Sequence, residues 1–113
     1  MDAAIVLTWS APFPGREKKA LEFAVQCDEH WGKLAAEGRC TQPEWFMLPT
    51  GGGIWMVKGE RRILEELVQT DETRRLIARG VVLNQDWGYT IADYGSGATR
   101  FIGEWAGELV VRR

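Results

Sequence analysis

EWFMLPTGGGIWMVKG, residues 44–59, places two apolar segments on either side of a loop that contains one proline and three glycines. Glycine adopts positive φ without a Cβ clash, so a five-residue Pro/Gly connection between two strand-forming segments is typical of a β-hairpin. A phosphate-binding loop would instead lead into the N-terminus of a helix, with Lys-Ser/Thr or another glycine at fixed spacing. The glycines lead into Ile54 and Trp55, so the stretch predicts a hairpin. Nucleotide binding would require a helix after Gly53.

A strand and a long helix are predicted before this hairpin. Residues 4–9, AIVLTW, are apolar and rich in β-branched side chains, and the following SAPFPG stops the strand and introduces a helix. From Arg16 to Glu37, apolar residues recur at alternating spacings of three and four, as an amphipathic helix requires. Gly38 is a suitable helix stop.

A second helical region and a long strand are predicted after the hairpin. Residues 60–69 carry an apolar helical stripe, and the next segment begins with Thr70 as an N-cap and ends at Gly80. This region is therefore two helices or one bent helix. Residues 81–94, VVLNQDWGYTIADY, alternate apolar and polar side chains and predict one long strand.

The chain divides into a domain over residues 1–94 and a C-terminal extension over residues 95–113. Apolar residues of the extension recur at helical spacing, which favours a helix; Gly103 and Gly107 leave a hairpin as the alternative. The extension is expected to pack on the domain or on a dimer partner.

The order strand, helix, strand, strand, helix, strand predicts an α+β, ferredoxin-like βαββαβ fold, with a four-stranded antiparallel sheet and two main helical regions on one face. The chain from Ala4 to Tyr94 resembles the dimeric α/β-barrel superfamily. The resemblance lies in this order of strands and helices, in the first strand IVLTW, and in LEELVQTDETRRL at residues 64–76. That resemblance implies two sheets paired face to face. Apolar side chains on the helix-free face independently need cover, so a homodimer is expected.

Composition argues against several classes of function. The 16 acidic and 14 basic residues give a formal net charge of −2 and leave no basic stripe for nucleic acid. No apolar run approaches the ~20 residues of a membrane span, and acidic Asp2 stands where a secretion signal would be basic, so a cytoplasmic protein without a membrane partner is expected. Cys27 and Cys40 lack CxxC spacing, and one histidine cannot form a multi-histidine site, so neither metal nor cofactor is predicted.

Two polar residues of the first predicted helix are the candidate catalytic residues. Asp28 falls near the sheet-facing side, where an isolated buried carboxylate is too costly; it either lines a wet cavity or lies on the margin of the apolar stripe. His30 is either a partly exposed histidine or a core histidine with a hydrogen-bond partner, or else a general base or hydrogen-bond donor at a pocket mouth.

The candidate ligand-binding residues are aromatic or polar side chains of the strands and the first helix: Trp9, Trp31, Trp55, Asn84, Asp86 and Trp87. The tryptophans either stack on an aromatic ligand or fill the core and dimer contact. Asn84 and Asp86 share one strand face and either line a pocket or mark an exposed sheet end.

These residues predict a protein that binds or transforms a small aromatic or apolar molecule in a cavity between helix and sheet. The monooxygenase-type members of the superfamily use asparagine, tryptophan and arginine or histidine in that cavity, and this set cannot be placed residue by residue here. No reaction is therefore assigned. The alternative is a non-catalytic homodimeric assembly or protein-interaction domain.

Overall fold

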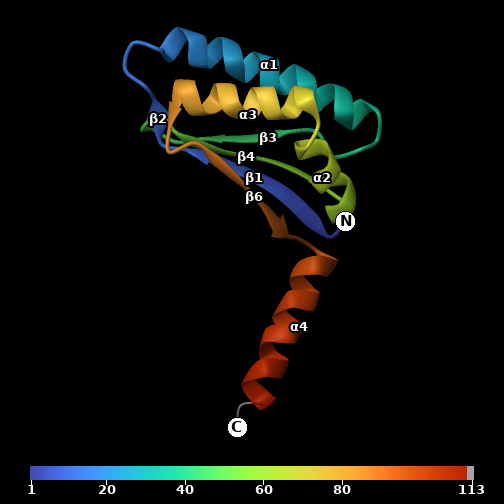
Figure 1. The fold of residues 1–113 in the computed structure, drawn as a ribbon. Coiled ribbons are helices and arrows are strands. Elements are labelled where there is room, and N and C mark those ends of the chain that lie inside the picture. Colours follow the sequence, from blue (N-terminus) through green and yellow to red (C-terminus); the bar gives the residue numbers. More distant parts are fainter. Residues whose placement is uncertain (112–113) are drawn as a thin grey trace.

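The computed structural model describes residues 1–111 as an antiparallel four-stranded sheet with two long helices on one face (Figure 1). The sheet order is β3-β4-β1-β6, with β1 at Ala3–Trp9, β3 at Glu44–Met47, β4 at Gly53–Gly59 and β6 at Gly88–Asp93. The helices of the domain are α1 (Glu17–Ala36), α2 (Arg61–Val68) and α3 (Asp71–Leu83). A small second sheet pairs β2 (Ala11–Pro12) with β5 (Asn84–Gln85). The predicted α+β fold and element order are confirmed.

The predicted hairpin is confirmed as β3 and β4. The loop between them turns at Gly51, whose φ of 90° favours glycine. Gly52 lies so close to the backbone of Ser10 that a Cβ built there would overlap it. The glycines therefore fold the loop tightly against the end of β1. Since Gly53 begins a strand and not a helix, the phosphate-loop alternative is wrong.

Alternate residues of β1 and β4 face the helices. Together with residues of α1 and α2 they form the larger of two buried clusters: Ala3, Ile5, Leu7, Trp9, Trp31, Trp55, Val57, Leu64, Leu67 and Val68. The smaller cluster joins α1 to the end of α3 through Ala20, Phe23, Cys27 and Leu83. Trp45 and Trp87, each partly buried, pack against both clusters. These two side chains therefore mark the space between the clusters.

Residues 81–94 do not form the single strand that their alternation predicts. The helix α3 continues through Gly80 to Leu83, and a turn with a positive φ of 54° at Asp86 separates β5 from β6. Gly80 is buried against the indole of Trp87, and a Cβ built there would overlap the ring. Glycine serves here as a close-packing residue inside the helix, which is why it does not end the helix as predicted.

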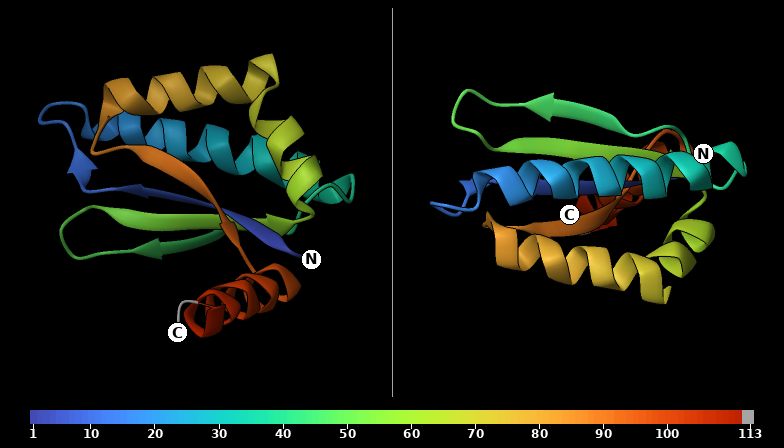
Figure 2. Two further views of the ribbon diagram at one scale, coloured as in Figure 1. Left: turned by 60° about the horizontal axis from the view of Figure 1, so that its bottom comes forward. Right: turned by 90° about the horizontal axis from the view of Figure 1, so that it is seen from above.

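The opposite face of the sheet has no helix over it (Figure 2). The strand register places Val6, Phe46, Ile54 and Met56 on this face, and Phe46 is 47% exposed. We call these four residues the open face. It is the one sheet surface whose apolar side chains are not covered by α1 or α3.

The C-terminal extension is a helix, α4 (Ser96–Val111), and not a hairpin. It meets the domain through the end of β6 and projects from the sheet on the open side, away from α1 and α3 (Figures 1 and 2). The helix does not lie along its own domain. The last two residues of the predicted extension, 112 and 113, lie outside the described residues.

His30 joins α1 to the first turn of α3. Its Nε2 is 2.8 Å from Thr73 Oγ1. The N–H of Thr73 also donates to the side chain of Thr70, the N-cap of α3. Its Nδ1 is 3.6 Å from Glu72, and the side chain is 12% exposed. Burial lowers the pKa of His30 below 6.5, against the opposing effect of Glu72. The neutral imidazole is therefore the form that suits the folded chain.

We predict that Gly80→Ala destabilises the protein by about 1–3 kcal/mol, because the added methyl group overlaps the Trp87 indole. Gly32 in α1 is the matched control, since a Cβ there meets only Gln42 Oε1 at 3.8 Å. Gly32→Ala should stabilise by roughly 0.5–1 kcal/mol through helix propensity alone. Urea unfolding of both variants measures the two effects, and equal changes would contradict the packing account.

We predict that protonation of His30 destabilises the fold. The folded-state pKa is lowered, so the stability contribution is fully present above 6.5 and is lost as the pH falls below that value. Thermal unfolding between about pH 8 and about pH 5 should show a smaller loss in His30→Gln, whose amide can still reach Thr73 but does not titrate. If both proteins lose the same stability between these pH values, protonation of His30 is not the cause of the loss.

Candidate functional site

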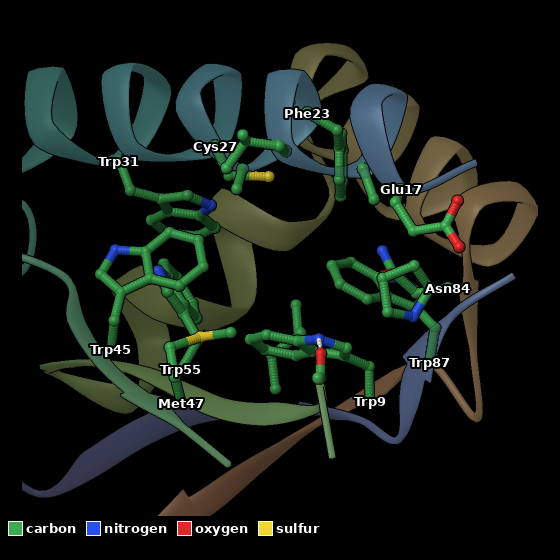
Figure 3. A pocket seen from close by; sticks show the side chains of 16 residues that line it. Trp9, Glu17, Phe23, Cys27, Trp31, Trp45, Met47, Trp55, Asn84 and Trp87 are labelled. Carbon is green, nitrogen blue, oxygen red and sulfur yellow. Dashed lines mark hydrogen bonds between the residues drawn. The ribbon is translucent and has the colours of Figure 1, made fainter. Parts of the chain in front are cut away.

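A cavity of about 230 Å³ lies between α1 and the sheet, and its walls are mainly aromatic (Figure 3). Five of the six tryptophans line it: Trp9, Trp31, Trp45, Trp55 and Trp87. The cavity occupies the space between the two buried clusters, where Trp45 and Trp87 pack against both. Large flat side chains that meet at steep angles leave such a space more readily than small aliphatic ones do.

The sheet register and one helical stripe bring these indoles together. Trp45 of β3 pairs with Trp55 of β4, and Trp55 pairs with Leu7 of β1, so all three face the helices. Trp31 reaches down from α1, and its ring centroid is 5.2 Å from that of Trp55. At the other end, the Trp9 centroid is 6.2 Å from those of both Trp45 and Trp87.

Four of the five indole N–H groups of the cavity fall into two pairs, one hydrogen-bonded and one not. Trp9 Nε1 donates to the Gly51 carbonyl at 3.3 Å, and Trp45 Nε1 donates to Asp28 Oδ1 at 3.0 Å. The buried Nε1 atoms of Trp55 and Trp87 have no acceptor among the described residues. A buried donor without an acceptor costs about 1–3 kcal/mol. Two of the side chains that line this apolar cavity therefore each carry a buried N–H without an acceptor among the described residues.

The ionisable lining side chains within residues 1–111 are Glu17 and Cys27. Burial raises the pKa of the Cys27 thiol to about 12, so the thiol is not a nucleophile at neutral pH. Glu17 is exposed in the first turn of α1, with its carboxylate at one end of the group of lining side chains (Figure 3). The buried amide group of the lining belongs to Asn84, which is 6% exposed.

Five of the predicted ligand-binding residues lie in the cavity wall: Trp9, Trp31, Trp55, Asn84 and Trp87. Asp86 does not, because the turn at its positive φ directs the carboxylate to Ser10 Oγ, 2.7 Å away. The strand face that Asn84 and Asp86 were expected to share is interrupted by that turn.

Neither candidate catalytic residue lines the cavity. Asp28 is exposed on the margin of α1, the second of its two expected positions, because the buried stripe of the helix passes through Cys27. Neighbouring helix positions differ by about 100° around the axis, so Asp28 lies beside the buried stripe, where its exposed carboxylate accepts the Trp45 Nε1 hydrogen bond from outside the cavity lining. His30 faces α3 and is the core-type histidine with a partner, Thr73.

Sequence reasoning missed several lining residues, including Trp45, Phe23, Met47 and Glu17. Trp45 and Met47 were detectable, because in a hairpin they alternate onto the side that Trp55 also faces. Phe23 lies on the apolar stripe of α1. No sequence signal marked Glu17, whose position depends on where the helix begins above the sheet.

The described chain has no group of three His, Cys, Asp or Glu side chains placed to hold a metal ion. Nor does any helix within residues 1–111 have the length and apolar character needed to cross a membrane.

Comparisons with known proteins give structural neighbours and no sequence relatives. No family model matches the chain, and no curated protein matches it. A crystal structure of a proposed antibiotic biosynthesis monooxygenase from Deinococcus radiodurans is similar over 82% of this chain and 92% of its own, with a TM-score of 0.66 and 12% identity.

Two further crystal structures show the same likeness. A protein of unknown function from Nitrosomonas europaea has a TM-score of 0.59 at 14% identity, over 82% of this chain and 88% of its own. A protein from Pseudomonas aeruginosa has a TM-score of 0.56 at 14% identity, over 83% of this chain and 94% of its own. At such identities the likeness shows the fold alone, and the chain shares the ferredoxin-like α+β fold of these neighbours.

Proposed function

We propose that this protein is a cytoplasmic homodimer that binds a small apolar or aromatic molecule in the cavity between α1 and the sheet. The observation that carries the proposal is an apolar cavity lined by two tryptophans, Trp55 and Trp87, whose buried indole N–H groups have no acceptor within residues 1–111. Ligand sites in proteins are typically apolar concavities with a few well-placed polar groups. This cavity has that composition.

The volume limits the size of the ligand. A cavity of roughly 150 Å³ is enough for benzene, and pockets for drug-sized ligands have about 300–1,000 Å³. At about 230 Å³, this cavity suits a ligand of one ring or two fused rings better than a larger fused-ring molecule.

The donors determine the polarity of the ligand. An acceptor within reach of Trp55 Nε1 or Trp87 Nε1 gains a hydrogen bond and also removes the cost of a buried, unsatisfied N–H. A hydrocarbon gains only the burial of its surface. The preferred ligand is therefore a flat apolar molecule that carries a carbonyl or ether oxygen.

Binding is favoured over catalysis by the groups within reach. Glu17 is exposed and Cys27 is held in its thiol form by burial, while Asp28 and His30 lie outside the lining. General acid or base catalysis requires a titrating group within hydrogen-bond reach of the reacting atom. For that reason Asp28 and His30 are not part of the proposed site, and no reaction is proposed.

The homodimer is supported by the open face. Apolar side chains on a helix-free sheet face need cover, and a second copy supplies it by two-fold symmetry. The alternative function, a non-catalytic assembly domain, uses the same open face but gives the tryptophans no role beyond packing. Ligand-binding measurements on the cavity distinguish these two functions.

We predict that 1-indanone binds at least about fivefold more tightly than indane, which has the same ring skeleton without the carbonyl. The double variant Trp55→Phe/Trp87→Phe keeps aromatic rings but removes both free donors, and should bind the two probes equally. Isothermal titration calorimetry measures each constant. Equal binding by the unaltered protein would show that the indole donors do not select the ligand.

We predict that Ala24→Phe abolishes 1-indanone binding, because Ala24 lines the cavity and the larger side chain fills it. The adjacent Val25 is 53% exposed and outside the lining, so Val25→Phe is the matched control and should bind normally. Thermal shift with the probe tests both variants. Retained binding in Ala24→Phe would place the ligand elsewhere, and the assembly function would then be preferred.

A further inference from the structure

The helix α4 has one apolar side and one charged side. Its apolar side carries Ala98, Phe101, Ile102, Trp105 and Leu109, at spacings of three and four residues. The charged side carries Arg100, Glu104 and Glu108, each four residues apart, and Arg100 Nε contacts Glu104 Oε1 at 3.0 Å. Amphipathic helices of this kind place the apolar side against a protein surface.

Beyond the partly buried Ala98, most of that apolar side is left uncovered by the described part of the chain. Phe101, Ile102, Trp105 and Leu109 are 58%, 60%, 63% and 60% exposed. At these exposures the four side chains leave roughly 500 Å² in water, an area near the largest apolar patch of a typical monomer. Trp105 is also the one tryptophan that does not line the cavity.

The junction with β6 sets the direction of α4. Tyr94 donates its N–H to the Asp2 carbonyl at 3.0 Å, and Gly95 then turns the chain with a positive φ of 57°. Gly97 packs so closely on the Asp2 carbonyl that a Cβ built there would overlap it. These contacts with the start of β1 direct the helix outward on the open side of the sheet (Figure 1).

The result is a projecting arm beside an uncovered sheet. The radius of gyration is 16.1 Å, whereas a compact domain of about this length has a value near 13 Å. The arm, about 24 Å long, leaves the domain on the side where a second sheet would have to pack.

We propose that α4 is a dimerisation arm whose apolar side packs on a second copy of this chain, the copy that covers the open face. The proposal rests on the homodimer proposed above and assigns to α4 a large part of its interface. By two-fold symmetry each chain gives one arm and receives one.

Interface area supports a second copy as the occupant. A standard interface buries about 800 Å² per partner. The apolar side of α4 offers roughly 500 Å² of this area. The open face adds further apolar area, since Phe46 is 47% exposed and lies beside Val6, Ile54 and Met56. The apolar side of α4 alone does not reach the standard size, so a dimer that uses it also needs area from the open face.

Sedimentation velocity over a dilution series tests the arm with full-length variants. Ile102→Glu/Trp105→Glu places two charges on the apolar side and should raise the dimer dissociation constant at least about 100-fold. Trp105→Ala/Leu109→Ala removes apolar area without adding charge and should raise it at least about tenfold. The control Glu104→Gln/Glu108→Gln changes the charged side and should leave the constant within about threefold.

The outcomes separate the arm from the homodimer. An unaltered protein that dimerises, with apolar-side variants that dimerise equally well, overturns the arm and leaves the homodimer in place. An unaltered protein that stays monomeric overturns both. Near-ultraviolet circular dichroism should keep the signal of the five cavity tryptophans in every variant, apart from the contribution of Trp105 where it is replaced, because α4 lies outside both buried clusters.

Discussion

The contact between Trp87 and Gly80 is the constraint on which the site depends. Trp87 follows the turn at Asp86, and its indole lies against the backbone of α3 where a side chain would exclude it. In that position the ring meets Phe23 of α1 at a centroid distance of 5.4 Å and Trp9 of β1 at 6.2 Å. One side chain thus joins both helices and the sheet, and it also forms one end of the cavity.

The elements of the fold were predictable because their signals are local. The Pro/Gly loop between two apolar segments defines β3 and β4, and the Thr70 N-cap marks the start of α3. Residues 81–87 were not predictable in the same way. Alternation suggested a strand, but the helix continues through Gly80 because of a tertiary contact with Trp87, which no local pattern records.

The candidate site was predictable in part for a related reason. Strand alternation has a period of two, so Trp9 and Trp55 could be assigned to the helix-facing side with little error. The side of a helix on which a residue lies is harder to predict, since an error of one residue in the assignment turns the side chain by about 100° around the axis. Asp28 and Cys27 differ by one position, and only Cys27 lines the cavity. The unsatisfied indole donors required coordinates, because a hydrogen-bond deficit has no sequence pattern.

The two surfaces proposed to bind other molecules share the same strands. Trp55 faces the cavity, while its neighbours Ile54 and Met56 face the open side of β4. Two unsatisfied donors at about 1–3 kcal/mol each are a substantial part of the 5–15 kcal/mol that stabilises an ordinary domain. A second copy packed on the open face would hold β4 from the side opposite the cavity and offset part of that cost. In the proposed dimer, cover on one side of the sheet would therefore help to stabilise a ligand-sized space with unsatisfied donors on the other.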